Sequence, residues 1–476
     1  MDILHAQLTA IQRRLAFVQT DPIDWRTQVL VFSWGICLFE SYLLLRQYPL
    51  YSKSTPPTVL AEHFTPQVFE KSQRYGKDKA QFSIVSGLYK QFIDTLQLAS
   101  GLYYPWAWRA SGQLLGLAGY GPEYLISQSV LFVFLLSFTS TLPTMPLGLY
   151  QTFVLEERHG FNKTTLALYF ADMLKGWALG IVIGTPLLSA FLYIFEWAGD
   201  RFVPWIMMLL LVFQLSMVIL YPTVIQPLFN KLSPLREGEL RTRVETLASR
   251  LKFPLKHLYE IDGSKRSSHS NAYFFGLPWS KHIVIFDTLI KQSQPEEVEA
   301  VLAHELGHWY HLHPTKLLLV SQLHLFTILA LFPAFLNAPP LLRSFGFPES
   351  VAARPPPIIA FFLYQMLLTP LEAVVGMALN AISRRFEYEA DRFACDLPAI
   401  LHADSASEKD RDAMKDMGTR LGRALVSLHA ENLSTVWVDW LYSAYHHSHP
   451  TLTERLKALG EYGSEGLGKT ETKKEQ

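Results

Sequence analysis

The chain has 476 residues, in which 42 Lys and Arg balance 42 Asp and Glu, and hydrophobic residues make up 49%. Because there is no net positive charge, nothing points to a nucleic-acid partner. The two cysteines, Cys37 and Cys395, can form neither a disulfide framework nor a cysteine zinc site. Any metal must therefore be held by histidines and carboxylates.

The apolar residues are gathered in long runs, and a helix that spans a bilayer needs about 20 of them. Seven runs qualify, at 27–47, 81–104, 124–150, 166–195, 203–229, 315–337 and 357–381. The run at 81–104 is the weakest because it contains Lys90 and Asp94. The first run follows a polar N-terminus and is predicted to be a retained anchor. The sequence thus predicts an all-α-dominated membrane protein with about seven transmembrane helices.

The loops between these runs differ in positive charge. The first and third loops, together with Arg46 beside the first, carry eight Lys and Arg, whereas the second, fourth and sixth loops carry four. Positively charged loops stay in the cytosol. We therefore expect the N-terminus in the lumen, and the active site and C-terminus in the cytosol, although Arg13, Arg14 and Arg26 favour the opposite orientation.

The spans divide the chain into a membrane region at 1–229, a cytosolic loop domain at 230–314, two spans at 315–381, a cytosolic part at 382–460 and a tail at 461–476. The tail has nothing to bury and is predicted to be disordered. In the loop domain, helices are predicted at 238–252 and 295–311, and a small β element at 282–287. Ser293 and Glu296 have the spacing of a capping box at the start of the second helix.

That second helix contains His304-Glu305-Leu306-Gly307-His308. Residues four apart lie on one helix face, so His304 and His308 can bind one zinc ion. Glu305 beside them can deprotonate a zinc-bound water. His311 shares the face but lies about 10.5 Å further along the axis, at 1.5 Å per residue. It cannot reach the same ion, and we expect it to be an interfacial or supporting residue.

A third ligand must come from elsewhere in the chain. Glu387 and Asp391 lie four residues apart in Glu387-Tyr388-Glu389-Ala390-Asp391, just after the last span. One of them can bind zinc while the other orients a ligand imidazole, and Glu389 is expected to point away. An ordinary solvated helix face is the alternative, and the spacing alone does not decide between them.

Four motifs in order, NAYFFG, HELGH, FEYEAD and YHHSHPTLTERL, resemble the type I, zinc-dependent integral-membrane CAAX prenyl proteases. The resemblance covers nearly the whole chain. It implies about seven transmembrane helices that enclose a chamber, and a cytosolic HExxH zinc-protease domain. It also implies one zinc ion per chain, held by His304, His308 and Glu387.

The same resemblance implies roles for the remaining site residues. Glu305 is expected to be the general base, and His449 a catalytic residue that stabilises the transition state. Asp391 and Arg455 are expected to support the ligands, and Asn271 to bind substrate. Each role is chemically sensible, because an attacked peptide carbonyl develops negative charge that zinc and a His N–H can stabilise.

The activity implied is that of an endoprotease that removes the C-terminal aaX tripeptide from prenylated CAAX proteins, by zinc-hydroxide attack on the peptide carbonyl. Some substrates would be cut at a second, N-terminal site. The expected partners are a prenylated protein or peptide and membrane lipid, because a prenyl chain partitions into the bilayer.

Two other hypotheses stay open on the sequence. A membrane quality-control metalloprotease would use the same zinc chemistry on misfolded or stalled proteins, without a lipidated cysteine. A transporter or channel with a structural metal would need neither a base nor an open coordination position, which argues against it.

The last four residues, Lys473-Lys474-Glu475-Gln476, resemble a dilysine retrieval signal, with a plain charged tail as the alternative. We therefore expect a multi-pass protein of the endoplasmic reticulum membrane, and the inner nuclear membrane is a second expected location.

Overall fold

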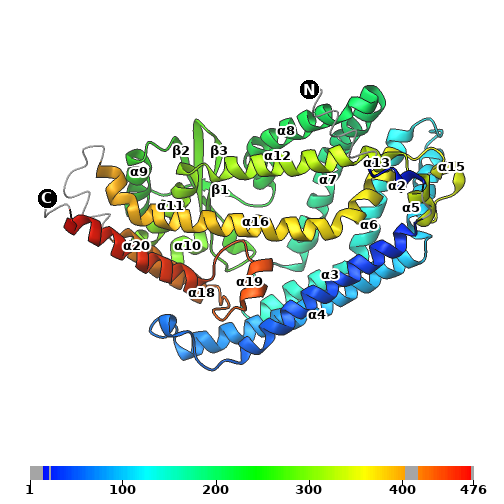
Figure 1. Ribbon diagram of the computed structural model, residues 1–476. Coiled ribbons are helices and arrows are strands. Elements are labelled where there is room, and N and C mark those ends of the chain that lie inside the picture. Colours follow the sequence, from blue (N-terminus) through cyan, green and yellow to red (C-terminus); the bar gives the residue numbers. More distant parts are fainter. Residues whose placement is uncertain (1–13, 21–22, 403–415, 473–476) are drawn as a thin grey trace.

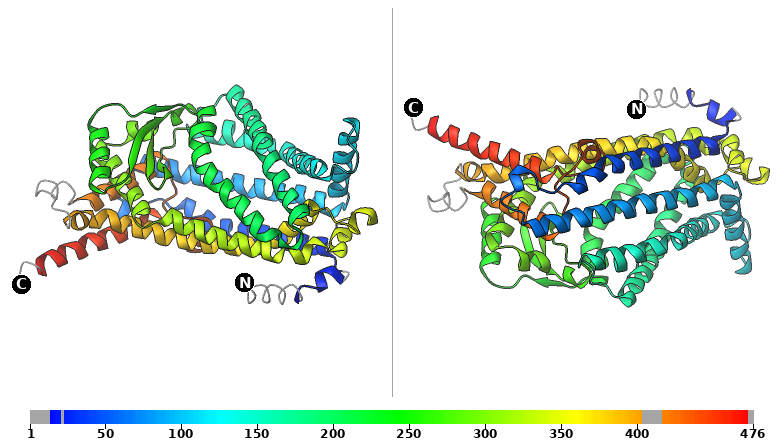
Figure 2. Two further views of the ribbon diagram at one scale, coloured as in Figure 1. Left: turned by 90° about the horizontal axis from the view of Figure 1, so that it is seen from above. Right: turned by 90° about the horizontal axis from the view of Figure 1, so that it is seen from below.

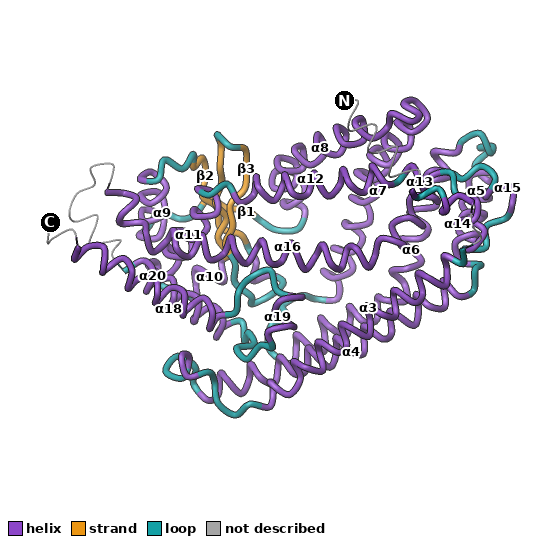
Figure 3. The backbone as a smooth tube through the Cα atoms, viewed as in Figure 1, coloured by secondary structure: helices purple, strands orange, loops and turns teal. Residues whose placement is uncertain are grey.

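The computed structural model describes residues 14–20, 23–402 and 416–472. It consists mostly of long helices, with one small sheet at one end (Figures 1 and 3). Within the described residues, six segments are long and apolar enough to cross a membrane: Trp25–Ser52, Leu125–Glu156, Leu166–Ala198, Phe202–Leu228, His313–Leu336 and Pro357–Pro398. The expected α-dominated membrane fold is confirmed.

The long helices are α3 (Trp25–Gln47), α4 (Pro66–Ala99), α6 (Leu125–Tyr150), α7 (Leu166–Ala198), α8 (Phe202–Leu220), α12 (His313–Leu331) and α16 (Pro357–His402). The predicted span at 81–104 falls mostly in α4, which is not among the six apolar segments. α4 lies along α3 and is joined to it by two polar contacts, from Trp34 Nε1 to Thr95 Oγ1 and from Gln91 Nε2 to Ser33 Oγ, both at 3.0 Å. These satisfied polar pairs explain how a less apolar helix joins the bundle. The predicted number of about seven spans is therefore one more than the six apolar segments found in the described residues.

These helices form a ring (Figure 2). α3 lies against α4, α4 against α6, α6 against α7, α7 against α8, and α8 against α12. α16 packs on α3, and it meets α12 where Glu372 Oε2 lies 3.1 Å from His324 Nε2. This ring is the arrangement that an enclosed chamber requires.

One apolar core lies at the end of the ring away from the sheet (Figure 1). Its largest fully buried side chains include Phe132, Phe202, Phe332 and Tyr364. The short helices at this end are α2 (Phe17–Thr20), α5 (Tyr103–Leu117), α13 (Pro333–Leu336), α14 (Pro339–Ser344) and α15 (Glu349–Ala352). The burial of these aromatic rings holds the helix ends together.

The second core belongs to a compact part built around the sheet. Its strands are β1 (Leu232–Pro234), β2 (Leu255–Ile261), β3 (Ala272–Leu277) and β4 (Ser280–Phe286), in the order β1-β2-β4-β3. Only β2 and β4 are parallel. Its helices are α9 (Glu239–Arg250), α10 (Asp287–Gln292), α11 (Pro295–Tyr310), α18 (Met417–Glu431), α19 (Trp440–His446) and α20 (Leu452–Thr472). β3 is therefore an edge strand, open to pairing with an extended peptide.

The predicted helices at 238–252 and 295–311 and the strand at 282–287 are confirmed as α9, α11 and β4. The predicted capping box is wrong by one residue: Gln294 is the N-cap and Glu297 its partner. Pro295 explains the shift, because proline favours the first helical position and so places the cap on the residue before it.

The disorder expected at 461–476 stays a prediction, and α20 continues to Thr472. Its first turns pack on α16 and α18, and extending an existing helix by one residue costs far less than nucleating a new one. The dilysine at 473–474 lies outside the described residues.

Candidate active site

The site forms where α11 crosses α16. Gly307 allows the close approach: a Cβ built on it would lie 3.1 Å from Ala390 Cα and 3.2 Å from Ala390 O. Both distances are shorter than ordinary van der Waals contact. A glycine in the middle of the HELGH helix therefore sets the distance between its two histidines and the carboxylates of α16.

Substituting Gly307 by Val is expected to force the two helices apart. Overpacking of this kind typically costs about 1–3 kcal/mol, which should appear as a lower melting temperature in detergent and weaker metal retention. Gly376→Val is the matched control, because Gly376 lies on α16 and its added Cβ would meet no heavy atom within 4 Å beyond the backbone of its own helix. Equal melting temperatures for the two variants would contradict this account of the helix crossing.

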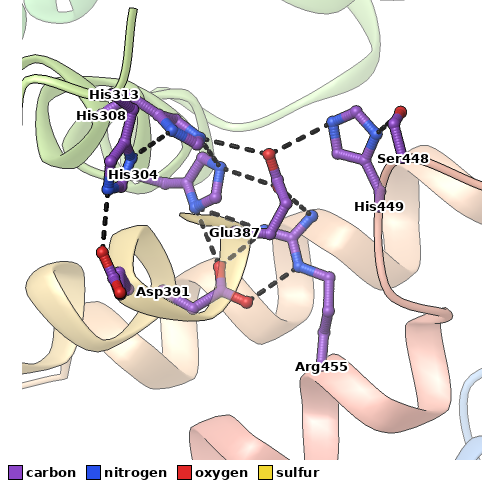
Figure 4. Close-up of polar contacts among 9 residues, drawn as sticks. His304, His308, His313, Glu387, Asp391, Ser448, His449 and Arg455 are labelled. Atoms are coloured by element: carbon purple, nitrogen blue, oxygen red, sulfur yellow. Dashed lines mark hydrogen bonds and ion pairs between the residues drawn. The ribbon is translucent and has the colours of Figure 1, made fainter. Parts of the chain in front are cut away.

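Three side chains from these two helices point at one another (Figure 4). His304 Nε2 lies 3.2 Å from His308 Nε2 and 3.3 Å from Glu387 Oε2. His308 Nε2 lies 3.2 Å from Glu387 Oε1. Among the described residues, these three form the one group of His, Cys, Asp and Glu whose atoms could hold a metal ion together.

The donor set fits zinc. Tetrahedral zinc holds nitrogen and oxygen ligands at about 2.0–2.2 Å, which places neighbouring ligand atoms about 3.4 Å apart. Glu387 Oε2 is buried, and no hydrogen bond from a described residue reaches it. Two imidazole lone pairs facing each other repel unless a cation or proton lies between them. Burial and Arg455 lower the pKa of His304, but Asp391 and Glu387 outweigh them and raise it to about 9, so this cluster favours a positive charge.

Glu305 follows the first histidine on α11 and lines a cavity together with His308 and Glu387. Burial raises the pKa of its carboxyl group above the ordinary value. A carboxyl group tuned in this direction is suited to taking up a proton and returning it near neutral pH.

His304 is held from behind by a buried ion pair. Its Nδ1 lies 2.9 Å from Asp391 Oδ1, which is fully buried. Arg455 of α20 donates from Nη2 to Asp391 Oδ1 at 2.6 Å and from Nε to Asp391 Oδ2 at 2.9 Å. If Nδ1 of His304 donates to the carboxylate, its Nε2 lone pair is free for a metal. The structure thus brings both predicted supporting residues to His304.

His308 has a support of its own that the sequence did not predict. Its Nδ1 lies 2.9 Å from Nδ1 of His313, whose Nε2 lies 3.0 Å from Glu389 Oε2. The expectation that Glu389 points away is wrong, because the turn between α11 and α12 brings His313 back to it. Leu312, with a φ of 57°, makes that turn. His311 instead stacks on His313, with ring centroids 5.5 Å apart.

The remaining predicted residues come from other segments. His449 Nε2 lies 3.3 Å from Glu387 Oε1, so the loop before α20 brings this residue to the metal-binding group as expected. Ser448 Oγ lies 2.9 Å from His449 Nδ1, a contact that was not predicted from the sequence. Asn271 is exposed, directly before the edge strand β3.

Two cavities meet at Ser448 and His449. The first, of about 760 Å³, is walled by apolar residues of α8, β3, α12 and α16 and reaches Glu305, His308 and Glu387. The second, of about 620 Å³, lies among α3, α4, α18 and α19 and is more polar: it is lined by Lys79 and five histidines, and none of its lining residues is Asp or Glu. The candidate metal site therefore stands between an apolar space and a polar one.

A HExxH helix, a carboxylate that faces it from a crossing helix and a ring of membrane helices together define an integral-membrane metalloendopeptidase. The family models agree: residues 47–231 match "CAAX prenyl protease N-terminal, five membrane helices", and residues 234–462 match peptidase family M48.

Comparison with individual proteins narrows the class of metalloendopeptidase further. The chain is 41% identical to CAAX prenyl protease 1 of Saccharomyces cerevisiae, over 93% of this chain and 96% of the yeast protein. It is 38% identical to the human CAAX prenyl protease 1 homolog, over 90% and 94% of the two chains. The crystal structure of S. mikatae Ste24p superposes with a TM-score of 0.82 at 41% identity, covering 92% of this chain and 99% of that one. The chain belongs to the CAAX prenyl protease 1 family.

Proposed function

We propose that this protein is a zinc-dependent endoprotease that removes the aaX tripeptide from prenylated CAAX proteins. The observation that carries the proposal is the position of the His304, His308 and Glu387 group, which opens onto a large apolar cavity. The lipid on the cysteine needs an apolar cavity, and the neighbouring peptide bond needs the metal-binding group, so the two must lie side by side. The names of the relatives support the same substrate class.

Zinc would be held by His304, His308 and Glu387, and when bound it would acidify a water molecule and polarise the scissile carbonyl. Glu305 takes the proton from the attacking water and returns it to the leaving amine. His449 donates a hydrogen bond to the oxygen on which negative charge develops. Asp391 and Arg455 hold the ring of His304 in place.

We propose that the peptide binds as an added strand along β3. The open edge of β3 supplies backbone donors and acceptors, and Asn271 stands at its beginning. The prenyl chain occupies the apolar cavity, in which Tyr273, Phe274 and Phe275 contribute part of the wall. The departing tripeptide, which ends in a carboxylate, enters the polar cavity on the other side of His449.

We also propose the cellular arrangement that the sequence predicts. The protein is a multi-pass protein of the endoplasmic reticulum membrane, also present in the inner nuclear membrane, with a lumenal N-terminus and a cytosolic active site. A second, N-terminal cleavage of some substrates would use the same site, because one metal-binding group is found in the described part of the chain.

The test is cleavage of a farnesylated Cys-a-a-X peptide by the purified protein in liposomes, with release of the tripeptide as the readout. We expect release from the farnesylated peptide, loss of release with a zinc chelator, and its return when zinc is restored. The matched control is the same peptide without the lipid. Equal cleavage of unlipidated peptides or unfolded proteins would replace our proposal with quality-control proteolysis. Stoichiometric zinc binding without any cleavage would reopen the transporter hypothesis.

A further inference from the structure

The two histidines of the HELGH helix are held from behind by different devices. The carboxylate of Asp391, neutralised by Arg455, contacts Nδ1 of His304. Behind His308 stands a second imidazole instead, and the carboxylate of Glu389 lies one step further away. A ligand histidine usually contacts a carboxylate, a backbone carbonyl or water directly. Here a second imidazole lies between His308 and the carboxylate, and this has a chemical consequence.

The consequence concerns which ring nitrogen carries a proton. The two Nδ1 atoms of His308 and His313 are 2.9 Å apart, so one of them must donate to the other. His308 can offer the lone pair of Nε2 to a metal only if its proton is on Nδ1. His313 must then accept at Nδ1 and carry its own proton on Nε2, where Glu389 accepts it at 3.0 Å. A carboxylate can only accept, so it selects this orientation of both rings.

The surroundings hold this arrangement in place. His313 is 1% exposed, and its ring stacks on Phe386 with centroids 4.1 Å apart and planes 6° from parallel. Arg385 Nε donates to the other oxygen of Glu389 at 3.0 Å, so both oxygens of the carboxylate have a partner. His313 is also the first residue of α12, whereas Glu389 belongs to α16. The support of one ligand is therefore built across two membrane helices.

We propose that His313 and Glu389 are positioning residues for the metal site, and that Glu389 fixes the tautomer of His308 through His313. The inference rests on the proposed zinc site but goes beyond its ligands. Neither residue contacts the metal in this assignment; His313 lines the apolar cavity as well, whereas Glu389 does not. Loss of such a supporting partner typically lowers metal affinity or activity 10–100-fold.

The chain contains a matched control for a purely structural role. His324 and Glu372 form a second His–carboxylate contact between α12 and α16, at 3.1 Å against 3.0 Å for His313 and Glu389. This second pair lies away from the metal-binding group. If the inner pair merely ties the two helices together, removing either pair should have the same effect.

The experiment measures zinc dissociation constants by competition with a chelating dye for Glu389→Gln, His313→Gln, Glu372→Gln and His324→Gln in the full-length protein. We expect the two inner substitutions to weaken zinc binding 10–100-fold and the two outer ones to change it less than twofold. With zinc in excess, kcat for the farnesylated peptide should fall in Glu389→Gln while KM stays unchanged. Glu389→Asp, which keeps a carboxylate that can only accept, should recover part of the loss.

Equal effects of the inner and outer substitutions on zinc affinity would overturn the inference. The inner pair would then only connect α12 to α16, as the outer pair does. The same holds if Glu389→Gln changes zinc binding no more than Glu372→Gln while both proteins melt at the same temperature. If the wild-type protein binds no zinc, the proposed function itself fails, which is a different and separately visible result.

Discussion

Replacing Glu305 by Gln is expected to lower kcat for the farnesylated peptide by about 10²–10⁴-fold, the usual contribution of a positioned general base. Gln is nearly the same size, so the packing of α11 should not change, but its amide cannot take up the proton of the attacking water. Zinc should stay bound at one ion per chain, because Glu305 is not one of the three residues that face one another. Single-turnover cleavage and metal analysis of the same preparation measure both quantities.

Glu297→Gln is the control for this substitution. Glu297 lies on the same helix, where its Oε2 accepts a hydrogen bond from the backbone N of Gln294 at 3.1 Å, far from the ligand end. A Glu305→Gln variant that keeps more than a tenth of the wild-type kcat would exclude Glu305 as the base. Loss of zinc together with activity would mean that the residue shapes the metal site instead.

Arg455→Met is expected to have the largest effect on stability. Its guanidinium group makes a bidentate contact with Asp391, and both side chains are buried. Removing one member of such a pair leaves the other charge buried without compensation, which costs about 3–5 kcal/mol. The melting temperature in detergent should fall, and zinc should bind more weakly because Asp391 no longer holds His304.

Two comparisons separate this effect from a simple loss of charge. Lys457→Met removes an exposed cation from the same helix, and we expect it to leave the melting temperature unchanged. The double variant Arg455→Met with Asp391→Asn should be less destabilised than the sum of the two single variants, because no charge of the pair is left buried without its partner. Additive effects would show that the two residues do not act as a pair.

Local patterns carried much of the fold prediction. The helix at 295–311, the strand at 282–287 and the strongest apolar runs all have a period or a length that a single segment displays. The span at 81–104 could not be judged in this way, because its polar residues are tolerated only where α3 offers partners for Gln91 and Thr95. The cap lies at Gln294 because proline at the next position favours the first helical position.

The predicted site residues gather around one point with one exception. His304, Glu305, His308, Glu387, Asp391, His449 and Arg455 come together from α11, α16, α20 and the loop before α20. Asn271 lies at the edge strand, where its role is still a prediction. His313 and Glu389 were missed because each looked like an ordinary polar residue within its own segment. Only the turn at Leu312, which folds α12 back along α16, makes them neighbours.

The sequence by itself determined the chemistry of the centre: two histidines one helical turn apart, with a glutamate between them, lie on one face of any α-helix. It also determined the membrane character, since apolar runs of that length have few other places to go. Spacing along the chain left open which carboxylate completes the group; the resemblance named Glu387, and the tertiary structure places it beside the two histidines and decides how His308 is supported. The reason is distance along the chain: Glu387 and Arg455 follow the HELGH motif by many residues, and no local rule relates their directions to it. α11 and α16 cross closely because residue 307 is a glycine, and this crossing turns the side chain of Glu387 toward the two histidines.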